Sequence, residues 1–194
     1  MKYSRRIAAA ACVLLIAAML GACSLPGRLG LFEGTSGQST ELINAQKQYT
    51  ITIPAGWSEQ EDDAEDVETD LFMANKQGTQ YVMVLGQSSE DYADDLTVKD
   101  YTTLYVNAFS GNTPDAEISE IGAVRIGELD GYSYEVKGEF DNMKLVYFIT
   151  CVQTDTEIVH LMGWSVQSQA DEAREVIRGI VGSFRAGVPD ANEA

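Results

Sequence analysis

Cys151 and His160 are residue types that nucleophilic catalysis uses, and a short turn separates them in the sequence. If the turn from Thr154 to Glu157 has two central residues, Cys151 lies directly opposite His160 on the next strand of a hairpin. An imidazole within hydrogen-bond reach of a thiol can generate the reactive thiolate. The spacing therefore predicts a Cys–His pair.

The neighbours of this pair favour a structural role. Apolar side chains surround both positions, and no Asn or Asp is placed to orient the imidazole ring. A thiol buried in such company stays neutral and inert. We therefore interpret Cys151 and His160 as core or pocket lining, with a Cys/His-dependent hydrolase as the alternative.

An acidic run from Glu59 to Asp70 could attract a cation, because eight of its twelve residues are acidic. Ca²⁺ takes six to eight oxygen ligands, but the run has neither the spacing nor the glycine of an EF-hand loop. A solvated acidic loop is the simpler interpretation. The metal alternative assigns the ligands to Asp62, Asp63, Glu65 and Asp66.

Aromatic side chains on predicted strands could line a ligand groove, although such residues usually build the core. The candidate ligand-binding residues are Trp57, Trp164, Tyr147 and His160. The sequence contains no zinc-type Cys/His cluster, no glycine-rich phosphate loop and no G-x-S-x-G motif. We therefore assign no catalytic residue and no cofactor.

The N-terminus reads as a secretion signal. A positive segment precedes residues 7–20, an uncharged stretch that would be about 21 Å long as a helix and too short to span a bilayer. The stretch ends in Leu20-Gly21-Ala22-Cys23, which resembles the lipobox of bacterial lipoproteins. We expect cleavage between Ala22 and Cys23, acylation of Cys23 (palmitate among the acyl chains) and anchoring of the chain in the lipid bilayer.

The charge of the chain restricts its partners. It has 13 Lys and Arg against 30 Asp and Glu, a net charge of −17. Removing Lys2, Arg5 and Arg6 with the signal makes the mature charge about −20, which disfavours nucleic acid as a partner. The mature chain would keep acylated Cys23 and free Cys151, so no intramolecular disulfide can form.

Hydrophobic periodicity divides the chain into four parts. Residues 1–22 form the signal peptide, 23–46 the lipidated Cys23 and a flexible tether rich in Gly and Ser, 47–186 one domain, and 187–194 a disordered tail. Within the domain, strands are expected at 49–53, 71–75, 80–86, 123–128, 132–140, 144–153 and 157–166. The segments 129–131, 141–142 and 154–156 are expected to be turns, and such short connections predict an antiparallel meander.

Two helices are expected to cover the sheet. Thr97 is a predicted N-cap, with Asp100 three residues later. The apolar face behind it is expected to consist of Val98, Tyr101, Leu104, Tyr105, Ala108 and Phe109, which recur at helical spacing. A closing helix begins near Ser168 or Gln169. Because the strand 144–153 is apolar on both faces, it should lie centrally with one helix on each side. The predicted fold class is α+β, with a central antiparallel sheet of six or seven strands and helices packed on its faces.

This order of elements resembles the PsbP-like superfamily, which includes the extrinsic P subunit of the oxygen-evolving complex, DcrB-like proteins and many small bacterial lipoproteins. The resemblance runs from Tyr49 to Phe184, through the segments 49–57, 96–101, 127–132, 147–149 and 180–184. It implies an α/β/α sandwich and a binding or assembly role. None of the family's metal or partner residues can be matched to positions here.

Together these observations predict a membrane-anchored surface lipoprotein outside the cytoplasm, on the extracellular face or in the periplasm. Its domain is expected to be non-catalytic and to bind an envelope protein partner or a small ligand. The alternative is a solute- or metal-capturing lipoprotein that works with a transporter.

Overall fold

The computed structural model describes residues 38–46, 48–60, 69–92, 96–113, 115–140 and 142–187 of the chain. The two α-helices of this part are α2 (Val98–Asn112) and α3 (Ala170–Gly182), and Ser89–Asp91 and Gln167–Gln169 form short 3₁₀ turns. The strands are β1 (Thr40–Ile43), β2 (Tyr49–Ile53), β3 (Trp57–Glu59), β4 (Leu71–Asn75), β5 (Gln80–Ser88), β6 (Glu117–Ile118), β7 (Gly122–Ile126), β8 (Leu129–Phe140), β9 (Met143–Gln153), β10 (Glu157–Val166) and β11 (Arg185–Ala186).

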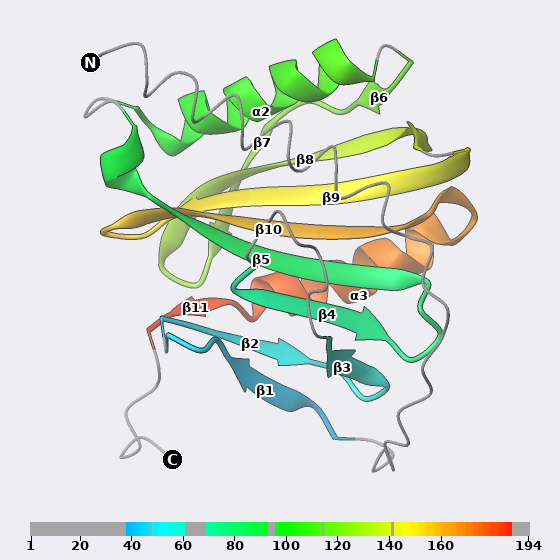
Figure 1. Cartoon of the computed structure of the whole chain (residues 1–194), viewed down its shortest axis with the longest axis horizontal. Coiled ribbons are helices and arrows are strands. Elements are labelled where there is room, and N and C mark those ends of the chain that lie inside the picture. The colour runs from blue at the N-terminus through cyan, green and yellow to red at the C-terminus, as the bar shows by residue number, and fades with distance from the viewer. Residues whose placement is uncertain are drawn as a thin grey trace.

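One large antiparallel sheet dominates the domain (Figure 1). Its strand order is β3-β4-β5-β10-β9-β8-β6, and β7 also pairs with β8. This arrangement confirms the predicted α+β class and the meander from β8 to β10. The sheet has eight strands and not six or seven, because the short strands β3 and β6 extend its edges.

A second, three-stranded sheet has the order β1-β2-β11. The sequence predicted a tether over residues 23–46 and a domain that begins at residue 47. Residues 40–43 pair with β2, so this strand belongs to the domain and the predicted boundary was too late. Thr40 lies opposite Ile53, and Leu42 packs against the core. At the other end, Arg185 pairs with Thr50, so both ends of the domain meet in this sheet. Of the expected tail 187–194, only Gly187 is described, and its N–H donates to the Gln48 carbonyl.

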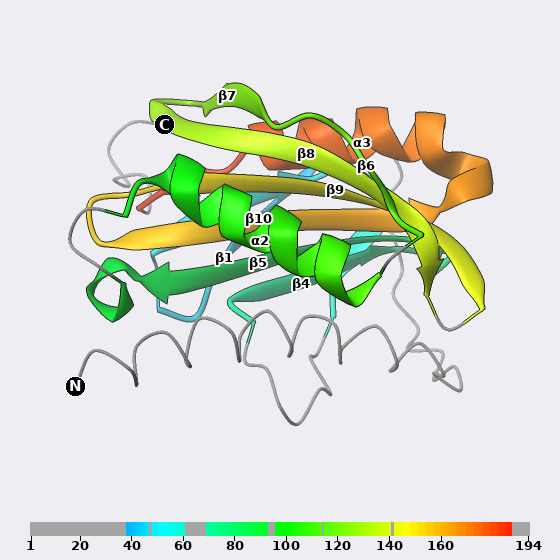
Figure 2. The same ribbon diagram turned by 90° about the horizontal axis from the view of Figure 1, so that it is seen from above.

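The large sheet has a separate core on each face, and each core is covered by one helix (Figure 2). α3 and β2 contribute to the first core, with Ala173, Ile177 and Phe184 buried there. α2 covers the second core, with Tyr101, Tyr105 and Phe109 buried against β8 and β9. Strand β9 lies between β8 and β10 and is buried on both faces from Leu145 to Val152, as predicted.

Helix α2 begins at the predicted capping box. The Asp100 N–H donates to the Thr97 hydroxyl oxygen at 3.2 Å, and the Thr97 N–H donates to the Asp100 carboxylate at 3.3 Å. The predicted apolar face of this helix was wrong at Leu104, which is 49% exposed. The helix rests on the sheet through Tyr101, Tyr105 and Phe109, a narrower stripe that turns Leu104 outward.

The turn between β7 and β8 lies earlier than predicted. Ile126 pairs with Leu129, so Gly127 and Glu128 form a two-residue hairpin turn and residues 129–131 belong to β8. Gly127 has a φ of 59°, and a positive φ at the first central residue is the geometry that such turns require. The expected turn at 129–131 was therefore wrong, and a shorter turn replaces it.

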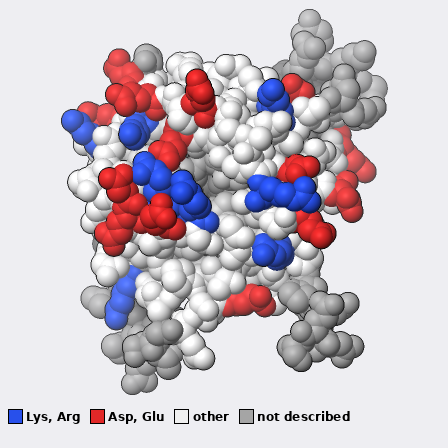
Figure 3. Space-filling view, turned by 180° about the vertical axis from the view of Figure 1, so that it is seen from behind, with Lys and Arg blue, Asp and Glu red and all other residues white. Residues whose placement is uncertain are grey.

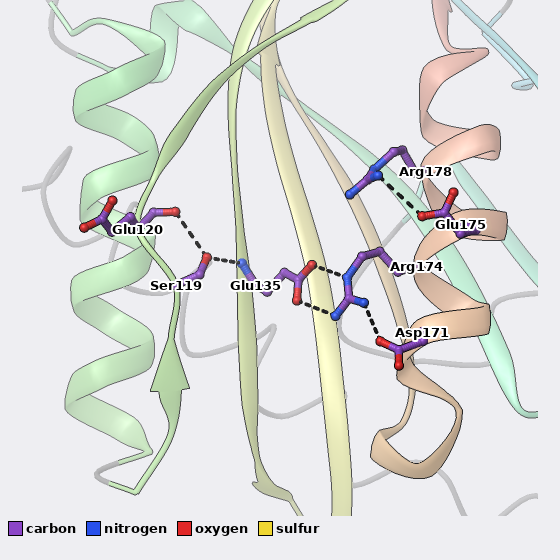
Figure 4. A network of polar contacts seen from close by, with 7 residues as sticks. All are labelled: Ser119, Glu120, Glu135, Asp171, Arg174, Glu175 and Arg178. Carbon is purple, nitrogen blue, oxygen red and sulfur yellow. Dashed lines mark hydrogen bonds and ion pairs between the residues drawn. The ribbon is translucent and has the colours of Figure 1, made fainter.

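An ion pair fastens α3 to the large sheet (Figure 4). Arg174 contacts Glu135 of β8 through two nitrogen–oxygen pairs, at 2.7 and 3.0 Å, and its third nitrogen lies 2.7 Å from Asp171. Its guanidinium carbon also lies 5.5 Å from the centre of the Phe148 ring. Beyond β8, the Glu135 N–H donates to the Ser119 hydroxyl, so the network extends to the segment that follows β6.

Candidate functional site

Cys151 and His160 occupy directly opposite positions on β9 and β10, which confirms the predicted register. The Cys151 Sγ atom lies 3.7 Å from the His160 Nδ1 atom. Both side chains are 0% exposed on the face that α2 covers. The distance alone would allow a nucleophilic pair, so the surroundings decide what this pair can do.

Tyrosine hydroxyls complete a buried hydrogen-bond chain beneath α2. The His160 Nε2 atom lies 2.5 Å from the Tyr101 hydroxyl, which donates to the Gln87 side-chain oxygen. The Tyr92 hydroxyl donates to the same oxygen at 2.5 Å, and the Tyr105 hydroxyl lies 3.4 Å from it. The Tyr101 hydroxyl donates its proton to Gln87, so it accepts a hydrogen bond from His160. We therefore assign the His160 proton to Nε2, and Nδ1 can then accept a hydrogen bond from the Cys151 thiol.

Burial keeps this chain of side chains neutral. Desolvation raises the pKa of the Cys151 thiol to about 12, and the Thr102 hydroxyl opposes that shift only in part. Desolvation also lowers the pKa of His160 to about 3. Near neutral pH the thiol therefore keeps its proton and the imidazole does not gain one. A thiolate–imidazolium pair, which cysteine catalysis requires, is disfavoured here.

A row of aromatic rings crosses the same face of the sheet. Trp164 of β10 lies directly opposite Tyr147 of β9 and Tyr81 of β5. Its ring centroid is 6.2 Å from that of Tyr147 and 5.2 Å from that of Tyr81. Phe72 of β4 stacks on both Trp164 and Tyr81, at 5.9 and 6.1 Å with interplanar angles of 11°. The row thus spans four neighbouring strands.

The row becomes more exposed with distance from α2. Tyr147 lies next to Phe109 of α2 and is 0% exposed, whereas Phe72, Tyr81 and Trp164 are each partly exposed. Figure 1 shows why, because α2 lies along β8 and β9 while β4 and β5 extend away from it. We call Phe72, Tyr81 and Trp164 the aromatic surface.

The structure brings together three of the four predicted ligand-binding residues. Trp164, Tyr147 and His160 share the face covered by α2. Trp57 lies on β3 and packs against the core on the α3 side, apart from the other three. Tyr81, Phe72 and Gln87 were not predicted, because their proximity to Trp164 and His160 depends on β5 pairing with β10, a strand that lies about 70 residues later in the sequence.

The predicted metal ligands Asp62, Asp63, Glu65 and Asp66 lie outside the described residues. Within the described ranges, no three His, Cys, Asp or Glu side chains gather in a way that could hold a metal ion. The same part of the chain has no helix long and apolar enough to cross a membrane.

The opposite face of the molecule has a different character (Figure 3). Lys and Arg side chains there are interspersed with Asp and Glu, on the side that carries α3. Arg174 is paired with Glu135 and Asp171. Arg178 is paired with Glu175, and Arg125 with Asp130. Each of these three arginines thus has an acidic partner, whereas the rings of the aromatic surface are partly exposed.

Comparison with known proteins identifies the fold. No family model and no curated protein matches the sequence. Among solved structures, cyanobacterial PsbP from Synechocystis sp. PCC 6803 superposes with a TM-score of 0.57 at 12% identity, covering 86% of this chain and 99% of that protein. LpqN of Mycobacterium tuberculosis, a protein involved in cell envelope biogenesis, superposes with a TM-score of 0.59 at 8% identity, covering 79% and 93%.

A third solved structure, from Bacteroides thetaiotaomicron, matches with a TM-score of 0.55 at 14% identity, covering 78% of this chain and 50% of that protein. Identities this low establish the fold and carry no ligand or partner across. The element order, the eight-stranded antiparallel sheet and these superpositions agree, and the domain therefore has an α+β fold like those of cyanobacterial PsbP and LpqN, as the sequence predicted.

Proposed function

We propose that this protein is a non-catalytic binding module, held outside the cytoplasm by acylated Cys23, whose aromatic surface contacts a protein of the cell envelope. The observation that carries the proposal is the stack of Phe72, Tyr81 and Trp164, partly exposed where the sheet extends beyond α2. Large aromatic rings with an exposed edge supply much of the binding energy in protein interfaces.

The buried Cys–His pair supports a binding role over catalysis. Both side chains are 0% exposed, and burial leaves Cys151 protonated and His160 neutral. A substrate would have to displace α2 to reach them, because two tyrosines of that helix pack against the His160 ring. The ring centroids of Tyr101 and Tyr105 lie 4.9 and 4.1 Å from that of His160. The pair is therefore better suited to fixing α2 on the sheet than to attacking a substrate.

The location rests on the sequence. The positive segment, the short apolar stretch and Leu20-Gly21-Ala22-Cys23 predict export, cleavage and lipidation. LpqN, which shares the fold, is involved in cell envelope biogenesis, and an envelope location for this chain agrees with that relationship.

The charge of the chain selects among partners. Once Lys2, Arg5 and Arg6 are removed with the signal, the net charge of −17 becomes about −20, and a protein this acidic repels acidic surfaces over several ångströms at physiological salt. Stacked aromatic rings attract apolar groups and cations, arginine above all. We therefore expect the partner to present apolar side chains flanked by Lys or Arg.

Purification of tagged, full-length protein from cross-linked cells tests this function. The wild type is compared with Tyr81→Ser and Trp164→Ala, each checked for folding by its melting curve, and with Trp57→Phe as a control on the opposite face. We expect one envelope protein to co-purify with the wild type and with Trp57→Phe, and to be lost from both aromatic-surface variants. Equal recovery with all four proteins would contradict the proposed surface.

Cys23→Ala tests the anchor in the same experiment. We expect this variant to leave the membrane fraction or to remain unprocessed, because the thioether can no longer form. Processed protein that stays fully bound to membranes would contradict lipidation as the anchor.

A further inference from the structure

We infer that α2 is a pH-sensitive cover of the large sheet, and that protonation of His160 releases it. His160 lies on β10 beneath this helix and is 0% exposed. A charged imidazole that water cannot reach is unfavourable, and lifting the helix would hydrate it. Acid would therefore uncover one face of the sheet before the whole domain unfolds.

The contacts of the first half of α2 converge on His160. Its Nε2 atom lies 2.5 Å from the Tyr101 hydroxyl, which also donates to Gln87 of β5, and the Tyr105 ring lies 4.1 Å away. A further proton would be added at Nδ1, which accepts from the Cys151 thiol 3.7 Å away. Both groups would then carry a hydrogen, and sulfur is a weak acceptor. Protonation therefore breaks this hydrogen bond and places a charge under the helix.

The surroundings of His160 offer an imidazolium no negative partner within the described part of the chain. The titratable groups that face it or its direct partners are Cys151 of β9, Tyr134 of β8, Tyr92, and Tyr101 and Tyr105 of α2. Strand β5 contributes the uncharged Leu85 and Gln87. The charged residues of α2, Lys99 and Asp100, are exposed in its first turn.

This burial sets the pH range of the release. It lowers the pKa of His160 from 6.5 to about 3, whereas an imidazole in water keeps the ordinary value. Between these two values, the protein with α2 released binds the proton that the covered protein does not. The ratio of released to covered protein should therefore rise by up to about tenfold for each pH unit below 6.5.

The two helices differ in what fastens them to the sheet. α3 is held by the ion pair between Arg174 and Glu135, at 2.7 Å. Among the ion pairs of the described ranges, none joins α2 to the sheet. The 15 residues of α2 are also too few for a stable isolated helix in water, so a released α2 would unwind. His160 can thus release α2 without releasing α3.

Release would enlarge the aromatic surface. Tyr147 is 0% exposed, and the ring of Phe109 on α2 lies 6.2 Å from its ring. Because Tyr147 lies directly opposite Trp164, its ring would extend the aromatic surface once α2 has left. Acid would then strengthen binding of the partner, and this step alone rests on the proposed function.

The labelling rate of Cys151 tests the release, because this thiol is 0% exposed beneath α2. The reagent is 4,4′-dithiodipyridine, which reacts with thiols even in mild acid, and the Cys151 peptide of full-length lipidated protein is followed by mass spectrometry. Dividing the native rate by the rate in urea at the same pH removes the intrinsic reactivity of the thiol. We expect this ratio to rise about tenfold between pH 6 and pH 5. A ratio that stays constant from pH 6.5 to pH 4 would overturn the inference.

Hydrogen exchange separates the release of α2 from unfolding of the whole domain. Protection factors, which are corrected for the pH dependence of exchange itself, should fall in acid for the amides of Val98–Asn112 and not for those of Ala170–Gly182. Equal losses of protection in both helices would mean global unfolding and would overturn a separate release.

Two variants identify the group that senses acid. In His160→Gln the side chain cannot gain a proton in this range, so the labelling ratio should no longer depend on pH. Tyr101→Phe keeps the imidazole and removes its contact with α2, so labelling should be faster at every pH with the same tenfold slope. The second variant decides the question if the first does not fold. A wild-type slope in His160→Gln, or a lost slope in Tyr101→Phe, would overturn His160 as the sensor.

Capture of the envelope protein by a benzophenone at position 81 tests the functional step in cells held at pH 7 or pH 5. We expect a higher yield at pH 5 in the wild type and no change in His160→Gln. Unchanged capture by a protein whose α2 is released would overturn the regulation and leave the proposed function standing. Absence of capture at both values would count against the proposed function, while the labelling of Cys151 still decides whether acid releases α2.

Discussion

The His160 Nδ1 atom lies 3.7 Å from the Cys151 Sγ atom, across directly opposite positions of two central strands. The pair has the spacing of a catalytic dyad and the environment of a core. Burial favours the neutral form of each group, so the hydrogen bonds tie β9, β10 and α2 together without creating a nucleophile.

The reactivity of Cys151 gives the most direct check of this interpretation. Because burial raises the pKa of the thiol to about 12, alkylation by iodoacetamide at pH 7.5 should be slow in the native mature protein and fast in denaturant. Mass spectrometry at timed intervals measures both rates. Native labelling as fast as that of the denatured chain would contradict an inert core cysteine.

His160 should make the fold sensitive to acid. Its pKa falls from 6.5 in the unfolded chain to about 3 in the folded protein, so the unfolded state binds the proton first as the pH drops. Stability should therefore decrease between these two values, by up to about 1.4 kcal/mol per pH unit from this group.

Carboxylates also titrate in that range, so His160→Gln serves as the reference. We expect the variant to be less stable than the wild type at pH 7, and the difference to shrink toward pH 4. Urea unfolding at several pH values measures it. Parallel stability curves for the two proteins would show that His160 does not carry the effect.

The Arg174–Glu135 pair should contribute to stability, whereas the neighbouring Arg178–Glu175 pair should not. The side chains of Arg174 and Glu135 are 24% and 30% exposed and meet through two contacts, while those of Arg178 and Glu175 are 69% and 75% exposed and 3.5 Å apart. We expect Arg174→Ala to lower the free energy of unfolding by about 1–2 kcal/mol, and Arg178→Ala by about 0.5 kcal/mol or less. If Arg174→Ala and Arg178→Ala lowered the free energy of unfolding equally in denaturant, a stabilising role for the Arg174–Glu135 pair would be contradicted.

Close packing of α3 on β10 depends on Gly163. A Cβ atom at this position would overlap the Ile177 side chain, lying 3.0 Å from its Cδ1 atom, whereas a Cβ at Gly179 on the exposed side of α3 would meet nothing within 4 Å. Gly163→Ala should therefore destabilise the protein by about 1–3 kcal/mol. Gly179→Ala should stabilise it by about 0.4–1 kcal/mol, since alanine favours the helix. Melting temperatures that move in the same direction would contradict this packing.

Local signals made much of the fold predictable. Alternation and apolar runs located β8, β9 and β10, and the two-residue turn after Thr154 fixed the register that places Cys151 opposite His160. The Thr97 capping box located the start of α2. These features depend on residues close together in the sequence, which is why residue types and spacing were sufficient.

The remaining features depend on contacts between distant segments. β1 and β11 flank β2 although more than 130 residues separate β11 from it, and two- or four-residue strands have no periodicity of their own. The aromatic surface arises because β5 crosses to pair with β10, which brings Tyr81 against Trp164. Gln87 joins the tyrosine hydroxyls for the same reason. No local pattern in the sequence specifies these pairings.

Site-specific cross-linking from position 81 in living cells identifies what the aromatic surface contacts. A benzophenone at position 81 reports on the aromatic surface, and the same group at position 104, on the exposed outer side of α2, serves as control. We expect an adduct with one envelope protein from position 81 that is absent from position 104 and lost when Trp164→Ala is added. Adducts of equal yield from both positions, or none with any envelope protein, would contradict a binding module that works through this surface.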